Sequence, residues 1–213
     1  MTDESYSESL DIPSSTVLII GGSSGIGFGL AKCFVQEGAS VIIIGRPQVK
    51  QSDKAVEELN RLGSKKVVYR INDVENINER LALHDWITCE YPQTNILINN
   101  AGIQQRHRFI PNEVFSKNIS WEEREKEIQI NICAAMHLSH LFITHFCQMK
   151  TKTAIINVSS DLAFASFALI PIYSSGVTRI CRVVGLSPNV FPKIKEFYYF
   201  CGSQQNFPFV FRN

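Results

Sequence analysis

The sequence predicts an α/β domain built on a doubly wound parallel sheet, and two observations carry this prediction. Continuous apolar runs rich in β-branched residues alternate with segments of helical periodicity from residue 16 to residue 159. Strands that lack polar alternation are typical of parallel sheets covered by helices on both faces. The intervening helical segments have the length that right-handed crossover connections need. A chain of 213 residues is long enough for one such domain.

Each element is placed by its own apolar pattern and by the glycines that follow it. In a sheet of this Rossmann type, ligands bind beyond the carboxyl ends of the strands, where the strand order reverses. We expect strands at Thr16–Ile20, Ser40–Ile44, Lys66–Ile71, Asn95–Asn99 and Thr153–Ser159, and helices at Ile26–Glu37, Gln51–Leu62, Ile77–Glu90 and Trp121–Met149.

Composition excludes several classes of protein. The formal net charge is +1, so no general attraction to nucleic acid or to an anionic membrane is expected. No continuous apolar run approaches the ~20 residues that span a bilayer. The cysteines are scattered and form no CxxC pair, which favours a reducing compartment, the cytoplasm, over a disulfide framework.

We divide the chain into three segments. Residues 1–15 are acidic and rich in serine, without the start of a secretory signal, and are expected to be a short disordered tail. Residues 16–190 are expected to form one domain. Residues 191–213 are an atypical tail rich in Phe and Tyr, which either covers part of the sheet or leaves a patch prone to aggregation.

A glycine-rich turn, GGSSGIG, follows the first strand and opens the first helix. Its glycines permit a tight turn and a close approach of the backbone to a pyrophosphate, to which the helix N-terminus offers N–H groups and partial positive charge. A flexible turn without a ligand is the alternative, but the order of strand, glycines and helix favours a dinucleotide site. We expect cofactor contacts from Gly21, Ser23, Ser24, Gly25, Ile26 and Gly27.

The ends of strands two and three bear on the choice of cofactor. Strand two ends in Ile44-Gly45-Arg46 without a carboxylate, and Arg46 can bind a ribose 2′-phosphate, which favours NADP(H) over NAD(H). A solvated surface arginine is the alternative interpretation. Asp73, followed by Val74, either accepts a hydrogen bond from the adenine amino group or simply stabilises its own turn.

The fourth strand is followed by Asn99-Asn100-Ala101-Gly102, the sequence NNAG. With the glycine turn, this motif makes the chain resemble the short-chain dehydrogenase/reductase family from Thr16 to about Tyr173. The amino-acid sequence around NNAG and IINVSS is similar to that of the DltE-like oxidoreductases, a subgroup linked by name to D-alanine esterification of teichoic acids. The resemblance implies an oxidoreductase that binds a nicotinamide dinucleotide, interconverts a carbonyl and an alcohol, and tends to form homo-oligomers.

The same resemblance assigns three catalytic residues. Asn131 matches the family's Asn in the helix after strand four, Ser160 matches its Ser at the end of strand five, and Tyr173 follows that Ser by 13 residues. By resemblance, Tyr173 exchanges a proton with the substrate oxygen, Ser160 donates a hydrogen bond to that oxygen, and Asn131 holds a water in a proton relay.

Two positions depart from the family pattern. Ile20 replaces a Thr whose hydroxyl ties strand one to the NNAG region, a loss of about 1 kcal/mol. Val177 replaces the Lys of the YxxxK motif, whose ammonium by resemblance lowers the pKa of the tyrosine and holds the nicotinamide ribose. A tyrosine without that cation is expected to titrate near ~10, so alcohol oxidation, which needs a base, suffers more than carbonyl reduction.

The region after Ser175 departs further, and the C-terminal part of the fold is expected to be incomplete. The helix that carries the Lys is not visible, whereas Arg182–Pro188 resembles the family's sixth strand and the proline loop after it. Excision of the helix and a shifted reading frame both explain this pattern. The sequence therefore supports an NADP(H)-dependent oxidoreductase impaired in this form, or a non-catalytic cofactor-binding pseudoenzyme or unstable truncated isoform.

The remaining polar groups have ordinary interpretations. His137 and His140 are three residues apart on the long helix without a third ligand, so we expect surface histidines and no metal site. The mixed-charge run Trp121–Glu127 is expected to be a solvated helix start. Arg106–Arg108 either forms a basic surface loop or borders the pocket of a polar or anionic substrate.

Overall fold

The computed structural model describes residues 10–46, 49–105, 120–160, 162, 170–176 and 194–201, of which 49–51 and 194–201 are described by their backbone alone. Six parallel strands form one sheet in the order β3-β2-β1-β4-β5-β6. The strands are β1 (Thr16–Ile20), β2 (Ser40–Gly45), β3 (Val68–Ile71), β4 (Thr94–Asn99), β5 (Thr153–Ser159) and β6 (Ile194–Cys201). The helices are α1 (Gly25–Gln36), α2 (Val49–Leu62), α3 (Ile77–Glu90), α4 (Trp121–Ile128), the π-helical η1 (Gln129–Ala134) and α5 (Ala135–Gln148).

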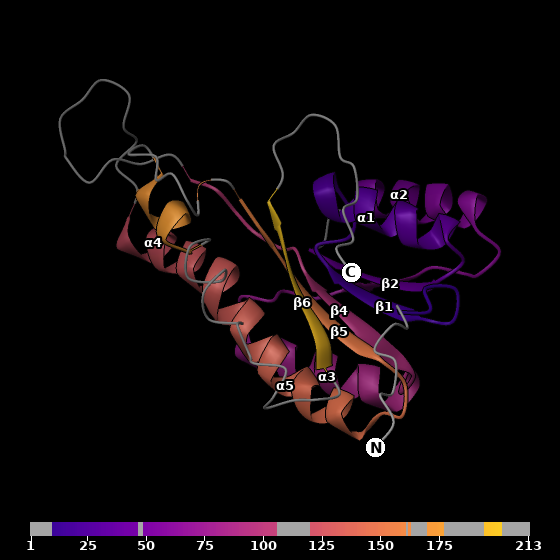
Figure 1. Cartoon of the computed structure of the whole chain (residues 1–213). Coiled ribbons are helices and arrows are strands. Elements are labelled where there is room, and N and C mark those ends of the chain that lie inside the picture. Colours follow the sequence, from indigo (N-terminus) through magenta and orange to yellow (C-terminus); the bar gives the residue numbers. More distant parts are fainter. Residues whose placement is uncertain are drawn as a thin grey trace, which may run out of the picture.

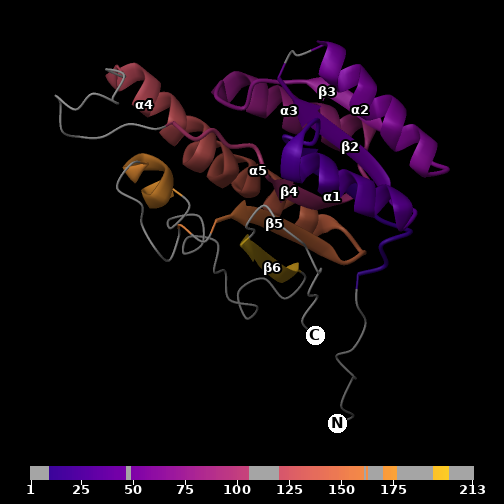
Figure 2. The ribbon, with the colours of Figure 1, turned by 90° about the horizontal axis from the view of Figure 1, so that it is seen from above.

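Helices cover both faces of the sheet. Helices α1 and α2 lie on one face, and α3 lies with the long α4–η1–α5 run on the other (Figure 1). The chain proceeds from β1 outward to β3 and then crosses to β4 on the other side of β1, so the strand order reverses between β1 and β4. In the view from above, β6 lies at the edge of the sheet beside β5 (Figure 2). The predicted doubly wound parallel α/β fold is confirmed.

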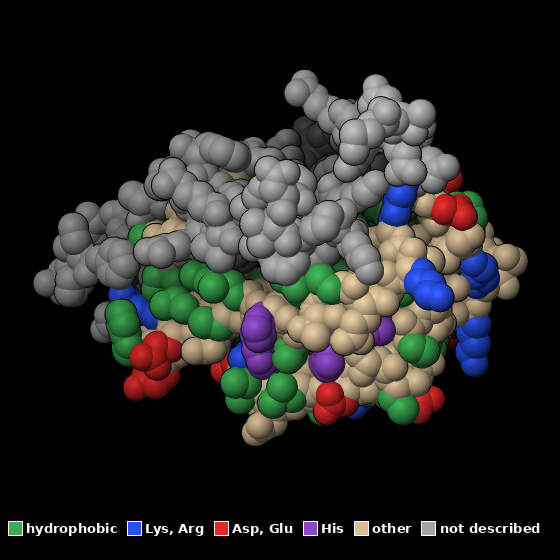
Figure 3. Space-filling model, turned by 60° about the horizontal axis from the view of Figure 1, so that its bottom comes forward, with side chains coloured by type: hydrophobic (Ala, Val, Ile, Leu, Met, Phe, Trp, Pro, Cys, Tyr) green, Lys and Arg blue, Asp and Glu red, His purple; other side chains and the backbone are tan. Residues whose placement is uncertain are grey.

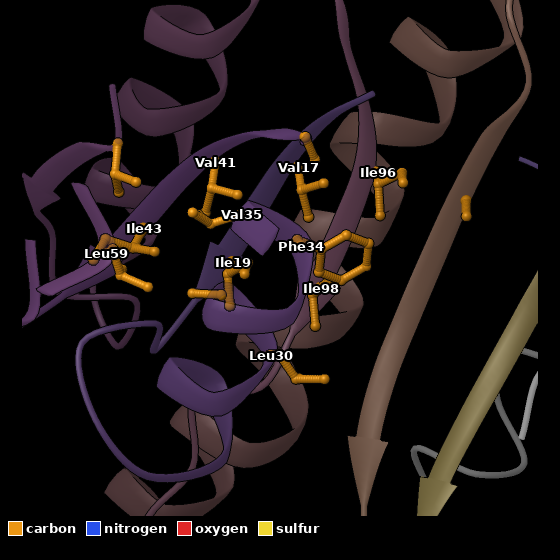
Figure 4. Close-up of a cluster of buried hydrophobic side chains, with 14 residues drawn as sticks. Val17, Ile19, Leu30, Phe34, Val35, Val41, Ile43, Leu59, Ile96 and Ile98 are labelled. Atoms are coloured by element: carbon orange, nitrogen blue, oxygen red, sulfur yellow. The ribbon is translucent and has the colours of Figure 1, made fainter. Parts of the chain in front are cut away.

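Side chains alternate between the two faces of the sheet along each strand, so the domain has two hydrophobic cores, one on each face. On β1, Val17 and Ile19 face α1 and pack with Phe34, whereas Leu18 and Ile20 pack on the α3 and α5 side. Figure 4 shows the first of these cores, in which side chains of α1 meet those of β1, β2 and β4. Because both faces are buried, the strands carry the unbroken apolar runs that the sequence displays.

The structure corrects the prediction of a disordered tail for the described part of residues 1–15. Leu10 and Ile12 pack against the α1-side core, and the Ser15 side chain is 1% exposed. The Asn95 amide of β4 donates to the Ser15 hydroxyl over 3.2 Å and thereby fixes the entry to β1. This segment is ordered because it covers apolar surface that the α1 side of the sheet would otherwise expose. Residues 1–9 lie outside the described residues.

The long helix expected at Trp121–Met149 is not one continuous α-helix. A π-helical turn, η1, separates α4 from α5. The combined run Trp121–Gln148 has 28 residues and is apolar enough to cross a membrane by length and composition. The apolar side chains of Leu138, Phe142 and Phe146 are fully buried against the sheet, and this packing accounts for the composition of the run.

The aromatic tail contributes a strand to the sheet. Ile194–Cys201 forms β6, which pairs in parallel with β5 from Thr153 to Ser159. The sixth strand expected from Arg182–Pro188 lies outside the described residues, and the domain boundary at residue 190 stays a prediction. The sequence left open whether residues 191–213 cover part of the sheet or leave a patch prone to aggregation. The described part, Ile194–Cys201, joins the sheet as its edge strand.

Candidate functional site

A cavity of about 430 Å³ opens at the carboxyl ends of the strands, at the reversal of strand order between β1 and β4. Almost all of the predicted cofactor residues line it, and so do two of the three predicted catalytic residues. The predicted residues in its wall are Gly21, Ser23, Ser24, Gly25, Ile26, Arg46, Asp73, Val74, Asn99, Asn100, Ala101, Gly102, Asn131 and Tyr173. The wall also contains residues that the sequence analysis did not assign to the site, namely Ile20, Ile44, Gly45, Asn72, Ile103, Gln104, Ile130, Ala135, Val158 and Ser159.

The turn between β1 and α1 leaves space where an anion would bind. Gly25 has a φ of +55°, and a Cβ built on it would meet no atom within 4 Å. Ser24 precedes the helix as its N-cap residue but makes no side-chain capping bond. The first N–H groups of α1 therefore face the cavity without a cap from that side chain, as in sites that bind the pyrophosphate of a dinucleotide.

Gly27 lies behind this turn, outside the cavity wall, and has a packing role. A Cβ at this position would lie 2.2 Å from the Gly21 carbonyl oxygen and 2.4 Å from Asn100 Nδ2. The absence of a side chain allows α1 to press against the end of β1. The cofactor contact expected of Gly27 stays a prediction.

The NNAG segment is tied directly to the glycine turn. Asn100 donates from Nδ2 to the Gly21 carbonyl over 2.9 Å, and its backbone N–H donates to the Ile20 carbonyl over 3.2 Å. These two bonds join the end of β1 to the NNAG segment after β4. By the family resemblance, this is the connection that the threonine hydroxyl replaced by Ile20 would have made. Asn100 thus holds the two sides of the cavity together without that hydroxyl.

Asn99 points away from the glycine turn, into the layer between β4 and α5. Its Nδ2 donates to Asn157 Oδ1 over 2.9 Å and to the Ser139 hydroxyl over 3.1 Å, and the side chain is 6% exposed. This buried polar network fixes β4 relative to β5 and α5, so that the end of β4 is held rigidly where it lines the cavity.

The wall near the ends of β2 and β3 carries the residues expected to bind the adenosine half. Arg46 is exposed directly after β2 and lines the cavity, and its role toward a phosphate stays a prediction. Asp73 Oδ1 accepts a hydrogen bond from the Glu75 N–H over 3.1 Å, the geometry of a turn aspartate. The hydrogen bond that Asp73 is expected to accept from the adenine amino group stays a prediction.

A buried arginine supports this turn from behind. Arg80 of α3 is 4% exposed, and its guanidinium donates to the carbonyls of Val74 and Glu75. Its Nε donates to His137 Nδ1 of α5 over 3.1 Å. Burial, then the Arg80 charge, then His140 lower the pKa of His137, which acts here as a hydrogen-bond acceptor. Figure 3 shows histidine side chains close to one another on one face of the molecule, but the described residues hold no group of three or more side chains that could bind a metal ion.

Two of the three predicted catalytic residues, Asn131 and Tyr173, lie in the cavity wall. Asn131 lies in η1 and is held by the loop after NNAG, since Nδ2 donates to the Ile103 carbonyl over 2.7 Å and Oδ1 accepts from the Ile103 N–H over 2.8 Å. Tyr173, half-buried, lines the cavity from a short helical turn at 171–176. That turn packs on η1, because a Cβ at Gly176 would lie 3.3 Å from the Ile132 side chain.

Ser160 follows β5 directly but is not part of the cavity wall, where Ser159 stands instead. The Ser160 hydroxyl accepts a hydrogen bond from the Leu162 N–H over 3.3 Å. Val177, at the position of the family's Lys, lies outside the described residues. The structure thus places Asn131 and Tyr173 at the cavity, and the roles of all three catalytic residues stay predictions.

One residue near the site contradicts its sequence interpretation. Glu127, the last residue of the mixed-charge run, is 0% exposed rather than solvated. Burial raises its pKa to about 7, and the backbone N–H of Gln105 acts in the opposite direction. Its position four residues before Asn131, on the same face of the helix, was the sequence signal that could have revealed its burial.

Fold and cavity together define a doubly wound α/β domain with a ligand cavity at the reversal of strand order, the place where such domains bind dinucleotides. A family model described as short chain dehydrogenase matches residues 15–179, and the chain belongs to that family.

Similar proteins agree with this assignment. The oxidoreductase DltE of Bacillus subtilis is 37% identical over 77% of this chain and 60% of its own length. A short chain dehydrogenase/reductase of Macrophomina phaseolina, dpmpG, is 29% identical over 84% of this chain and 98% of its own length. A solved short-chain dehydrogenase from Sphingobium yanoikuyae in complex with NADPH superposes with a TM-score of 0.72 at 26% identity, covering 84% of this chain and 66% of that one. The chain thus spans about three fifths of the length of DltE, to which its sequence resemblance is confirmed.

Proposed function

We propose that this chain binds NADP(H) in the cavity between β1 and β4 and is an oxidoreductase that interconverts a carbonyl and an alcohol, impaired in this form. The carrying observation is the open space over Gly25 at the uncapped start of α1, beside the NNAG segment. Arg46 in the cavity wall, without a carboxylate at the end of β2, supports NADP(H) over NAD(H). The NADPH held by the Sphingobium relative supports the same choice.

The chemistry assigned to the chain follows from the elements that meet at the cavity. A bound nicotinamide supplies or takes a hydride. Tyr173, which borders the cavity, would give its proton to the oxygen of a reduced carbonyl. Ser160 would donate a hydrogen bond to that oxygen, since a hydroxyl that accepts from the Leu162 N–H can still donate its own proton. Asn131 fixes Ile103 and would hold the relay water.

Val177 is the specific observation that favours a second candidate, a cofactor-binding protein without turnover. Position 177 holds Val where the family resemblance implies a Lys, so the cation that by resemblance stabilises an ionised Tyr173 is not supplied from that position. Under either proposal we place the protein in the cytoplasm, with a nicotinamide dinucleotide as its ligand and no nucleic-acid or membrane partner. A homo-oligomer remains compatible with both.

One assay separates the two candidates. The purified chain and its Val177→Lys variant are tested for NADPH consumption against a panel of aldehydes and ketones. The oxidoreductase proposal expects slow turnover that Val177→Lys raises by about 100-fold, and that Tyr173→Phe abolishes in the same background. No turnover by either chain, with a melting temperature that still rises with NADPH, would establish the non-catalytic binder instead. Rapid turnover by the unchanged chain would eliminate that binder.

A further inference from the structure

The backbone at the end of β2 is held by hydrogen bonds to three successive carbonyls. The Ile44 carbonyl accepts from two N–H groups of the glycine turn, over 2.8 and 3.1 Å, and the Gly45 carbonyl accepts from the Asn72 N–H over 3.0 Å. The Arg46 carbonyl, directly after the strand, accepts from the Tyr69 hydroxyl over 3.1 Å. The first two contacts use backbone donors only. The third depends on a single side chain, that of Tyr69.

Packing fixes the position of the Tyr69 ring. Tyr69 lies in β3, where its backbone is in register with Ile43 of β2, and its side chain packs against the α1-side core. A Cβ built on Gly45 would lie 3.3 Å from Tyr69 Cε2, so the absence of a side chain at Gly45 leaves room for the ring. The place of the hydroxyl is therefore set by the ring, and Tyr69→Phe removes the hydroxyl while keeping the packing.

The same hydroxyl is bound from α2, which fixes the direction of its proton. Ser52, 1% exposed, donates from Oγ to Tyr69 Oη over 2.9 Å. A carbonyl only accepts, so the Tyr69 proton is directed to Arg46 and the phenol oxygen accepts from Ser52. Tyr69 thus bridges α2 to the backbone that follows β2.

The Arg46 side chain has no comparable support. It is exposed and lines the cavity, and none of the ion pairs between described residues includes its guanidinium. Binding an anion with a long side chain requires the side chain and its backbone to become ordered, which weakens the affinity. A backbone that is fixed before binding removes part of this cost. The hydrogen bond from Tyr69 therefore bears on how tightly Arg46 can hold an anion.

We propose that Tyr69 is a positioning residue for the choice of cofactor. Its hydroxyl fixes the backbone of Arg46 and thereby holds the guanidinium in the cavity wall, where it would bind a ribose 2′-phosphate. NADH lacks that phosphate, so loss of the hydroxyl should weaken the binding of NADPH alone. The inference rests on the proposed function, because it requires NADP(H) in this cavity with its 2′-phosphate at Arg46.

The first test is calorimetric titration of Tyr69→Phe with NADPH and with NADH. Loss of one ordinary hydrogen bond corresponds to about a fivefold change in affinity, so the Kd for NADPH should rise about fivefold and that for NADH less than about twofold. Tyr91→Phe is the matched control, since it removes a phenol hydroxyl before the start of β4, at the edge of the sheet opposite the cavity, and should change neither Kd. Equal rises for both nucleotides would overturn the proposal and leave the proposed function intact.

The second test is a double-mutant cycle with Arg46→Ala, which asks whether Tyr69 acts through the Arg46 side chain. The alanine keeps the carbonyl that Tyr69 binds but has no guanidinium to position. Tyr69→Phe should therefore cause no further rise of the NADPH Kd in that background. A general structural effect of the hydroxyl would appear in both backgrounds, and a second rise of about fivefold in Arg46→Ala would refute the positioning role.

The third test measures the hold on Arg46 without any nucleotide, as the backbone order parameter from NMR relaxation. We expect about 0.85, the value of rigid backbone, in the unchanged chain and a lower value in Tyr69→Phe. A value below about 0.6 in the unchanged chain would overturn the proposal, whether or not Tyr69→Phe melts cooperatively. If Arg46 is rigid but the unchanged chain binds neither NADPH nor NADH, the proposed function is contradicted, and the inference about cofactor choice falls with it.

Discussion

Gly27→Ala tests the packing that shapes the cofactor cavity. The added methyl carbon would stand 2.2 Å from the Gly21 carbonyl oxygen and 2.4 Å from Asn100 Nδ2, so α1 must move away from β1. Overpacking of this kind costs about 1–3 kcal/mol. Loss of the 2.9 Å bond between Asn100 and Gly21 adds about 1 kcal/mol. We expect Gly27→Ala to lower the free energy of unfolding by roughly 3 kcal/mol and the melting temperature by roughly 10 °C.

Gly29→Ala is the matched control, two residues later in α1. A Cβ at Gly29 would meet no atom within 4 Å, and the position is helical. Alanine should therefore raise the free energy of unfolding by up to about 1 kcal/mol. Both variants are compared with the unchanged chain by thermal melting followed by circular dichroism, with and without NADPH. If Gly27→Ala melts within a degree of the unchanged chain, the close approach of α1 to β1 is not as described.

Three further perturbations test other parts of the account. Glu127 has a pKa of about 7 in the folded chain against 4.5 for the free group, so between these pH values the folded state binds more protons than the unfolded state. The free energy of unfolding should therefore fall by up to about 3 kcal/mol as pH rises through this range. Urea unfolding from pH 5 to pH 8 should show this loss in the unchanged chain and not in Glu127→Gln. Arg80→Met leaves the carbonyls of Val74 and Glu75 without their donor and should cost about 3 kcal/mol, and an unchanged urea midpoint would contradict that support. Arg46→Ala should raise the Kd for NADPH about tenfold or more and leave that for NADH nearly unchanged in parallel titrations, whereas equal effects on both would remove Arg46 from the 2′-phosphate site.

Local patterns in the sequence predicted most of the fold. The bounds expected for β1, α3 and β5 coincide with those observed, because each element begins and ends at a strong local signal. Asn76, for example, caps α3 by accepting from the Asn78 N–H over 2.9 Å. The glycine turn and NNAG could be assigned to one edge of the sheet because parallel strands bring their carboxyl ends together.

The elements that sequence reasoning missed depend on long-range contacts. The π-helical η1 leaves no mark in the hydrophobic period, since Ile130, Ala134 and Leu138 continue the apolar stripe through it. Strand β6 owes its place to pairing with β5 and not to its own aromatic composition. The burial of Glu127 was likewise missed, because the charges around it outweighed its place four residues before Asn131 on the same helix face.

Isothermal titration of the purified chain with NADPH tests most directly whether the cavity at the end of β1 holds a nicotinamide dinucleotide. We predict one site per chain with a Kd in the micromolar range, or about −8 kcal/mol. Gly25→Val should abolish this binding, because it fills the open space where the backbone has a φ of +55°. A cooperatively melting chain that takes up neither NADPH nor NADH at millimolar concentration would contradict the account.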